Sequence, residues 1–462
     1  MVGRAVKRIC VVSVVLATVG SGGATGASTV GGTKLWVARY NGPSNSADEV
    51  GAIAVSPDGE QVFVTGRDVG SPGYLAIATL SYDTSTGLVR WLQRFNAPGE
   101  GTDQGTDVAV SPDGSMVFVT GQSEDVRSSS AIVTLAYSAS SGSPIWLRLY
   151  RGPERRDNYP SSMAVSPDGS TVFVAGHSAG ADGDWDFVTL AYDASTGSPS
   201  WGRRYDGPYN GSDYASAIAV SADGSTVFVT GGTTGSTNGV DYATVAYEAS
   251  TGVIRWSRRF DGPHHLDDVP DAVAASPVGS VVFVTGYSEV ADLDDEYATV
   301  AYSATTGSIL WTRTLDDPTG GSSIAESLAV SPDGSRVFVT GDSHAQAVTV
   351  AYDASTGGTA WIARYAIPGG SVFARSIAVS PDGSTVFVAG TSARFTNANY
   401  TALAYQAATG AKQWVRRYNS LANDDDSVQA LAVGPDGTKV FLTGFSSRGL
   451  SSFDYATVAF AA

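Results

Sequence analysis

A tetrapeptide that returns at a nearly constant interval is the feature of this sequence that most restricts its fold. Ser-Pro-Asp-Gly, or a variant with one substitution, occurs eight times, and the first copy occupies residues 56–59. The intervals between successive copies are 55 residues five times, then 49 and 54. The later copies start at Ser111, Ser166, Ser221, Ser276, Ser331, Ser380 and Gly434. A fixed period of this length indicates that each copy marks one unit of a repeat architecture rather than a separate domain.

Each repeat has the pattern of two β-hairpins. The tetrapeptide is a tight-turn sequence, because Pro fixes φ at the second position, Asp suits the third and Gly tolerates the conformation at the exit. It separates a run of small and apolar residues, as at 216–220, from a β-branched and aromatic run, as at 226–231. A second strand pair follows at 242–247 and 254–260, joined by a Ser-Thr-Gly turn. Four antiparallel strands repeated eight times predict an all-β fold, an eight-bladed β-propeller.

The two ends of the chain complement each other. The sequence stops after a third strand, residues 453–460, and lacks the fourth strand that should follow it. A fourth-strand sequence occurs instead near the beginning, at residues 32–40, where the spacing from Gly32 to Trp36 equals that from Gly197 to Trp201. We therefore expect the N-terminal strand to pair with the C-terminal blade and close the ring, which an open solenoid would not need.

The first residues have the pattern of a signal peptide. Three basic residues precede an apolar stretch at 9–19, and Ala24 or Ala27 offers a small-residue cleavage site. The apolar stretch is shorter than the roughly 20 residues that a membrane-spanning helix needs. The sequence thus predicts a signal peptide at 1–27, a single propeller domain at 28–462, and a secreted, extracellular monomer without a membrane span.

Charge and cysteine content narrow the classes of partner. Cys10, the only cysteine, lies within the apolar stretch, so the mature chain is expected to have no disulfide, thiol nucleophile or cysteine metal site. The chain carries 28 basic and 45 acidic residues, a net charge of −17. This excess argues against nucleic acid and anionic membrane as partners and is compatible with cation binding and with solubility.

Two stretches carry a resemblance to a family of bacterial repeats. Residues 36–43 read Trp-Val-Ala-Arg-Tyr-Asn-Gly-Pro, and Asp-Tyr-Ala-Thr occurs at 241–244 and again at 454–457. They resemble the SBBP-type bacterial β-propeller repeat, and the likeness extends over almost the whole predicted mature chain. The resemblance implies an exported or surface propeller and assigns no particular role.

A second resemblance is to the tryptophan-docking motif of quinoprotein (PQQ) propellers, Ala-x-Asp-x-x-Thr-Gly-x-x-x-Trp. The motif is complete at 191–201 and 351–361. Looser copies end at Trp91, Trp146, Trp256, Trp311 and Trp414. The resemblance implies that each tryptophan packs between neighbouring blades. Dehydrogenases of that family also carry a catalytic Asp, calcium-ligating Glu, Asn and Asp residues and often adjacent cysteines. This set cannot be placed here, so PQQ is not expected as a cofactor.

The sequence at 176–180 imitates a catalytic motif. Gly-His-Ser-Ala-Gly fits G-x-S-x-G, the nucleophile elbow, which requires a strand, a sharp turn and then a helix. A Gly-x-Ser recurs at the end of the second strand in most repeats, and no helical pattern follows any of them. We interpret Ser178 as a repeat position and not as a nucleophile.

Acidic residues accumulate in the loops of one face. In an up-and-down blade the loops before the first strand and between the second and third strands open on the same face, where function usually concentrates. One Asp recurs eight residues before the turn serine (or Gly434), or nine residues in one repeat. These candidates are Asp48, Asp103, Asp157, Asp213, Asp268 and Asp426. Clustered carboxylates can ligate Ca²⁺, although no segment matches the complete twelve-residue calcium loop. The alternative is that they make local turn bonds and keep the protein soluble.

The four histidines of the chain fall on the same face. His177 and His344 begin loops between second and third strands, and His264 and His265 lie in a loop that leads to the next blade. Together they could form a metal or acid–base site. They belong to three separate parts of the ring, however, so scattered surface histidines are the alternative interpretation.

The sequence therefore leaves two functional hypotheses. The first is a non-catalytic exported propeller whose acidic loop face binds an extracellular ligand, glycan or protein, with Ca²⁺ as a candidate cofactor. The second is an enzyme, a lyase, hydrolase or quinoprotein-like dehydrogenase, with carboxylates or histidines at the mouth of the axial channel. The positions that could be catalytic are mostly repeat positions, which favours the first hypothesis, although the fold does not decide function.

Overall fold

The computed structural model describes residues 30–70, 73–97, 101–124, 129–153, 155–235, 239–291, 294–316, 321–394, 397–420, 425–447 and 452–462. The predicted signal peptide with Cys10 lies outside these residues. The described residues form strands, turns and irregular connections, and no helix among them is long and apolar enough to cross a bilayer.

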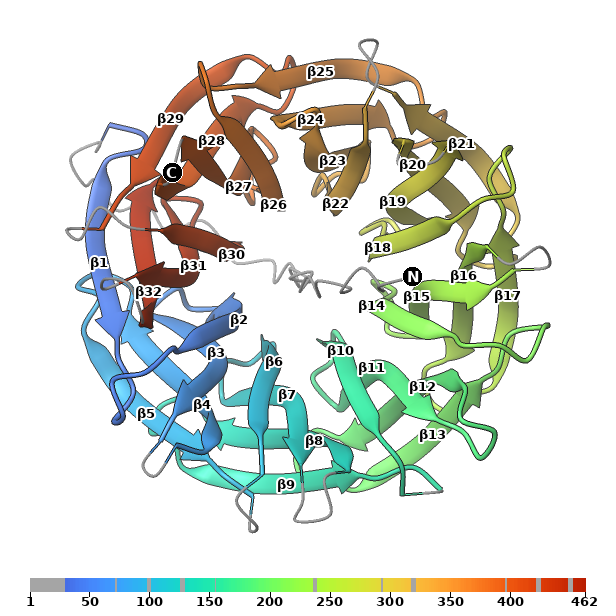
Figure 1. The fold of residues 1–462 in the computed structure, drawn as a ribbon, viewed down its shortest axis with the longest axis horizontal. Helices are drawn as coiled ribbons and strands as arrows, with labels where there is room; N and C mark the ends of the chain where they lie inside the picture. Colours follow the sequence, from blue (N-terminus) through green and yellow to red (C-terminus); the bar gives the residue numbers. More distant parts are fainter. Residues whose placement is uncertain are drawn as a thin grey trace.

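Thirty-two strands form eight four-stranded antiparallel sheets, arranged as blades around a central axis (Figure 1). The first strands, innermost in each blade, are β2 (Glu49–Val55), β6 (Asp103–Val110), β10 (Asn158–Val165), β14 (Tyr214–Val220), β18 (Asp268–Ala275), β22 (Ser323–Val330), β26 (Ser371–Val379) and β30 (Asp426–Val433). The second strands are β3 (Gln61–Val69), β7 (Met116–Glu124), β11 (Thr171–Ala179), β15 (Thr226–Thr234), β19 (Val281–Ala291), β23 (Arg336–Ser343), β27 (Thr385–Arg394) and β31 (Lys439–Ser447).

The third strands are β4 (Leu75–Asp83), β8 (Ser130–Ser138), β12 (Trp185–Asp193), β16 (Val240–Glu248), β20 (Asp294–Ser303), β24 (Gln346–Asp353), β28 (Asn397–Gln406) and β32 (Phe453–Ala461). The outer strands are β5 (Val89–Phe95), β9 (Pro144–Tyr150), β13 (Pro199–Tyr205), β17 (Ile254–Phe260), β21 (Ile309–Leu315), β25 (Thr359–Tyr365), β29 (Lys412–Tyr418) and β1 (Lys34–Tyr40). We number the blades 1 to 8 in the order of their first strands, from β2 to β30. The predicted eight-bladed all-β propeller is confirmed.

The ring closes through the N-terminal strand, as predicted. β1 is the outer strand of blade 8 and pairs antiparallel with β32, with Val37 opposite Val458 and Tyr40 opposite Tyr455. The backbone N–H of Gly32 extends this pairing by donating to the carbonyl of Ala461 at 2.7 Å. Every blade thereby has four strands, although blade 8 takes its strands from both ends of the described chain.

The tetrapeptide forms the turn between first and second strands. In blade 4, the N–H of Gly224 donates to the carbonyl of Ser221 at 2.8 Å, and Gly224 has φ +71°. The carboxylate of Asp223 accepts hydrogen bonds from the hydroxyl of Ser221 and the N–H of Ser225. Because these contacts are local, the tetrapeptide predicts the hairpin wherever it occurs.

Tryptophans join successive blades. The indole N–H of Trp201 on β13 donates to the carbonyl of Ala249 in blade 4 at 2.8 Å, and its ring packs between Phe173 and Tyr247. The turn glycine Gly252 lies so close that a Cβ there would stand 2.6 Å from the indole ring. The role that the docking-motif resemblance implied for this tryptophan is confirmed.

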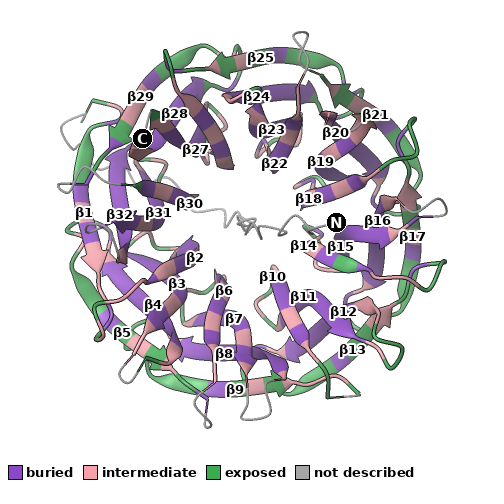
Figure 2. Ribbon diagram, in the orientation of Figure 1, coloured by how far each residue is buried: buried purple, intermediate pink, exposed green. Residues whose placement is uncertain are grey.

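Burial follows the position of a strand in its blade. Second and third strands are mostly buried, whereas the residues of the outer strands are mostly exposed or partly exposed and the tryptophan of each is buried (Figure 2). In the first half of most first strands, partly exposed residues alternate with buried ones; in β18 these are Val269 and Asp271, and Ala274 and Ala275 at its end are also partly exposed. Since the second strand covers the outer edge of each first strand and neighbouring blades cover its flanks, these partly exposed residues face the axis.

Candidate functional site

Five of the six predicted aspartates fix the link into a blade, which is the segment between the outer strand of one blade and the first strand of the next. Asp213 lies just before β14, is fully buried, and accepts a hydrogen bond from the N–H of Gly207 at 2.5 Å. It also accepts one from the hydroxyl of Thr233 on β15. The equivalent backbone donors are Gly42 to Asp48, Ala97 to Asp103, Gly262 to Asp268 and Ser420 to Asp426, at 2.5 to 2.7 Å. These carboxylates therefore take part in local turn bonds, the alternative left open by the sequence.

Burial sets the electrostatics of these carboxylates. Desolvation raises the pKa of Asp48 to about 6 and that of Asp268 to about 6, although the backbone hydrogen bonds oppose the increase. The pKa values of Asp103, Asp213 and Asp426 are raised for the same first reason. A charge at these positions is thus costly unless a cation or further donors stabilise it.

Asp157 does not occupy the position of the other five. Asn158 is the residue opposite Ser178 in blade 3, as Asp268 is opposite Ser288 in blade 5. Asp157 instead accepts a hydrogen bond from the N–H of Ser130 at 2.9 Å, across to the preceding blade. The spacing of nine residues, one more than in the other repeats, had already distinguished it.

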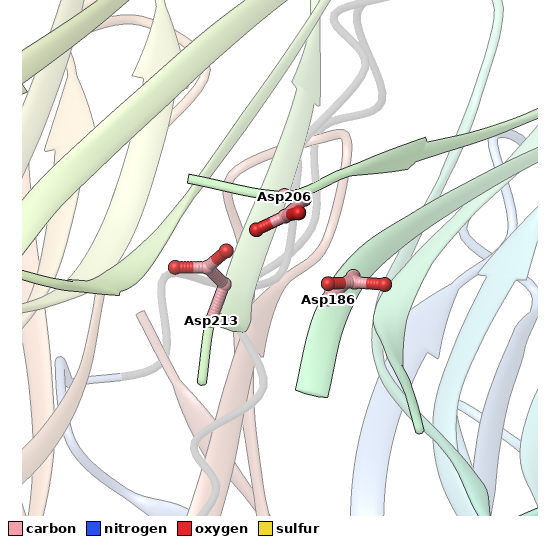
Figure 3. Close-up of side chains that lie close together, drawn as sticks. All are labelled: Asp186, Asp206 and Asp213. Atoms are coloured by element: carbon pink, nitrogen blue, oxygen red, sulfur yellow. The ribbon is translucent and has the colours of Figure 1, made fainter. Parts of the chain in front are cut away.

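Two groups of three carboxylates lie at equivalent positions of consecutive blades. Asp186 at the start of β12, Asp206 in the link after β13 and Asp213 bring one oxygen each to within 4.8 Å of one another (Figure 3). The second group, one repeat later, is Asp241, Asp261 and Asp268. Among the described residues, the other four predicted aspartates belong to no such group. Asp206, Asp241 and Asp261 were not among the candidates taken from the sequence, although the recurrence of both groups at an interval of 55 residues was a visible signal.

Each group is paired with one arginine. The guanidinium of Arg204 on β13 forms an ion pair with Asp186, and Arg259 on β17 pairs with Asp241. The pKa of Asp206 is raised mainly by burial. The negative charges of Asp186, Asp182 and Asp184 raise it further. Three carboxylates and one guanidinium leave an excess of two negative charges, which matches a divalent cation with oxygen ligands.

The structure does not bring the four histidines together. His177 is buried at the end of β11, where its ring packs edge-on against Trp185 and Tyr214 with centroids 5.1 and 5.2 Å apart. His264 and His265 are exposed in the link between blades 4 and 5, and His265 contacts Asp261 at 3.0 Å. His344 is exposed in the turn between β23 and β24. No group of three possible metal ligands among the described residues includes a histidine.

Ser178 lies in a strand pair and not in an elbow. It is fully buried on β11, opposite Asp186 on β12, and its hydroxyl accepts a hydrogen bond from Arg204 at 2.7 Å. The chain continues from β11 through a loop into β12 without a helix. The interpretation of Ser178 as a repeat position is confirmed.

The axial side of blades 5 to 7 carries ionisable residues. Asp271, Glu326 and Arg375 occupy the same position in β18, β22 and β26, the residue that bulges out of the strand pairing. Arg375 donates to Glu326 at 3.1 Å, and burial together with the charge of Glu326 raises the pKa of Asp271 well above its usual value. PQQ is a tricarboxylate, and here it would meet two carboxyl groups and a guanidinium already paired with one of them. This part of the axial surface does not fit the quinone.

Eight four-stranded blades joined by docked tryptophans define a PQQ-like β-propeller. The chain belongs to the family described as outer membrane protein assembly factor BamB, whose model matches residues 20–276 and 294–458. No curated protein matches the sequence significantly.

Solved structures share the fold at low sequence identity. The quinohemoprotein alcohol dehydrogenase ADHIIG of Pseudomonas putida HK5 is 13% identical, with 93% of this chain and 76% of that chain covered and a TM-score of 0.56. Sqt1 of Chaetomium thermophilum, solved bound to the N-terminus of ribosomal protein L10, is 16% identical, with 90% and 97% covered and a TM-score of 0.59. A europium-containing methanol dehydrogenase is 12% identical, with 93% of each chain covered and a TM-score of 0.54. At these identities the likeness shows the fold alone, since enzymes and a peptide-bound propeller share it.

Proposed function

We propose that this protein is an exported, non-catalytic binding propeller of the SBBP repeat type, whose acidic loop face binds divalent cations and presents them to an extracellular partner. Export rests on the pattern of residues 1–27, and the repeat type on the stretches at 36–43 and 454–457. The observation that carries the binding function is the pair of carboxylate groups at equivalent positions of two neighbouring blades.

The chemistry of each group supports a hard cation. The ligands are carboxylate oxygens within 4.8 Å of one another, and Ca²⁺ takes six to eight such oxygens with flexible geometry. Asp213 and Asp268 are already fixed by backbone donors, so binding would have to order only the more exposed members, Asp206 and Asp261. Bound cations would also relieve the repulsion that contributes to the raised pKa of Asp206.

Calcium-dependent melting tests this function. Since a cation that binds only the folded state stabilises it by about 2.7 kcal/mol at a hundredfold excess over its Kd, millimolar Ca²⁺ should raise the Tm and a chelator should reverse the increase. Equilibrium dialysis should find one Ca²⁺ for each group. The combined variant Asp206→Asn, Asp261→Asn should lose most of both effects, because each group loses one ligand and one charge.

Blade 5 provides the matched control. Asp316 follows β21 as Asp206 follows β13. The position that Asp213 and Asp268 occupy in the two groups is taken next to Asp316 by Ser323, so the third carboxylate is missing. Asp316→Asn should therefore leave the calcium response unchanged. If Ca²⁺ and chelator leave the melting curve of the unmodified protein unchanged and dialysis finds no bound calcium, the proposed cation function is wrong.

A further inference from the structure

Blade 7 differs from the others because the repeat that leads into it is the shortest. The loop between β23 and β24 contains only His344 and Ala345, both at positive φ, whereas seven residues separate the equivalent positions Thr233 and Asp241 in blade 4. The position of the buried link aspartate is taken by Val372, which is also buried. The link into blade 7 thus lies beside a shorter loop and lacks the carboxylate that five of the other blades have at this position.

A pocket of about 280 Å³ lies beside this link. Its walls include Ile367 and Pro368 from the link, Ser392 and Arg394 from the end of β27, Asn399 from β28 and Arg417 from β29. Two guanidinium groups and no carboxylate line it. The pocket therefore has a positively charged lining, although the chain as a whole has a net charge of −17.

The neighbouring repeats show which group this position ordinarily holds. Arg417 is opposite Thr401 in the strand pairing, as Arg204 is opposite Val188 and Arg259 opposite Ala243. In blades 3 and 4 the arginine forms an ion pair with a carboxylate at the start of the third strand, Asp186 or Asp241. In blade 7 the equivalent residue is Asn399, opposite Ser392.

Without that carboxylate, the polar groups of blade 7 are only partly satisfied. The side chain of Arg417 donates to the hydroxyl of Tyr365 at 2.8 Å and has no carboxylate partner among the described residues. The side-chain oxygen of Asn399 is buried and makes no hydrogen bond to any described residue. Because an amide can turn to exchange its oxygen and nitrogen, Asn399 can offer a ligand either an acceptor or a donor.

We infer that this pocket binds a small carboxylic acid, whose carboxylate takes the place that Asp186 and Asp241 occupy beside their arginines. An arginine binds a planar carboxylate through two parallel N–H donors, and such charge-assisted bonds are about twice as strong as neutral ones. Because Asn399 stands in blade 7 where blades 3 and 4 have an Asp, no negative charge at this position repels a ligand carboxylate. The amide of Asn399 lies beside that carboxylate instead. The volume lies just below the range of pockets for drug-sized ligands, about 300–1,000 Å³, and therefore favours a small acid.

Titration with succinate, a small dicarboxylate, tests the inference. Calorimetry on the full mature chain should show saturable binding of succinate and none of the neutral isostere succinamide. Arg417→Met should weaken binding at least about tenfold, which corresponds to the loss of one charge-assisted contact. Asn399→Asp should weaken it equally while the protein stays folded, because it restores the internal carboxylate of blades 3 and 4 beside Arg417.

Two controls make the outcome decisive. Arg255→Met removes an arginine from β17, the outer strand of blade 4, which contributes no residue to the pocket. This variant should leave the succinate affinity unchanged. Inorganic phosphate tests whether any small anion suffices. Absence of saturable succinate binding, binding unaffected by Arg417→Met and Asn399→Asp, or binding of phosphate in preference to succinate would each overturn the assignment. None of these results depends on calcium, so the cation function stands or fails separately.

Discussion

At the scale of single residues, the buried aspartates of the links are the unusual feature, because burial favours their protonated form. Asp48 is fully buried, and its pKa is raised to about 6 by desolvation and by the charges of Asp68 and Asp454. In the unfolded chain the same carboxyl group has the ordinary value of 3.8. The folded state therefore holds this proton more tightly than the unfolded state does.

This difference predicts the direction of a pH effect on stability. The stabilisation from Asp48 is fully present below pH 3.8 and is lost as the pH rises through about 6. Between these values the unfolding free energy of the unmodified protein should fall by up to about 3 kcal/mol relative to that of Asp48→Asn. Urea unfolding of both proteins at pH 4, 5, 6 and 7 measures this difference. A constant difference at all four values would show that Asp48 does not titrate in this range.

Asp353 provides a comparison of opposite sign. Hydrogen bonds from Ser355 and Thr356 lower its pKa to about 2. Any stabilisation from this exposed turn carboxylate is present above pH 3.8 and is lost as the pH falls toward 2, outside the window assigned to Asp48. The two kinds of aspartate can therefore be separated by the pH range in which each acts.

At the scale of elements, the docked tryptophans determine how firmly one blade holds the next. Trp256 on β17 donates to the carbonyl of Ala304 at 2.9 Å and packs against Phe228 and Tyr302. Trp256→Phe should cost about 1–3 kcal/mol, because it leaves that buried carbonyl without its donor. Trp185→Phe, on the loop face and only partly buried, should cost less than about 1 kcal/mol. Chemical denaturation measures both, and equal losses would argue against a special role of docking.

The elements could be predicted from sequence because their signals are local. The turn at 221–224 is fixed by contacts within five residues, and Trp201 reaches an acceptor at a fixed position of the next repeat, the alanine that follows the third strand. Groups assembled across blades were harder to predict. Asp186 and Asp206 meet only because a third strand and a link end side by side, and a periodic pattern does not show which recurring residues approach each other. The blade 7 pocket requires a short loop and a substitution together, so neither change alone would have indicated it.

At the scale of the whole molecule, β1 is the element on which closure depends. Besides pairing with β32, it docks on both neighbouring blades: Trp36 donates to the carbonyl of Thr84 in blade 1 at 2.9 Å. On the other side, the guanidinium of Arg416 in blade 7 donates to the carbonyl of Gly32 at 2.9 Å. Strand β1 and the two residues before it, residues 32–40 in all, thus connect three consecutive blades.

Removal of this strand should open the ring. Deletion of residues 28–42 leaves β32 with an unpaired edge whose residues are mostly buried in the closed ring, and such an edge templates association. We expect a loss of several kcal/mol in stability or concentration-dependent aggregation, measured by chemical denaturation and by light scattering. A synthetic peptide of residues 30–47 added in trans should restore the monomer, because it supplies the missing outer strand, whereas the same peptide with Trp36→Ala should restore it less well. A truncated protein that stays monomeric and melts at the temperature of the intact chain would mean that blade 8 is stable with three strands, and that closure contributes little to holding the ring together.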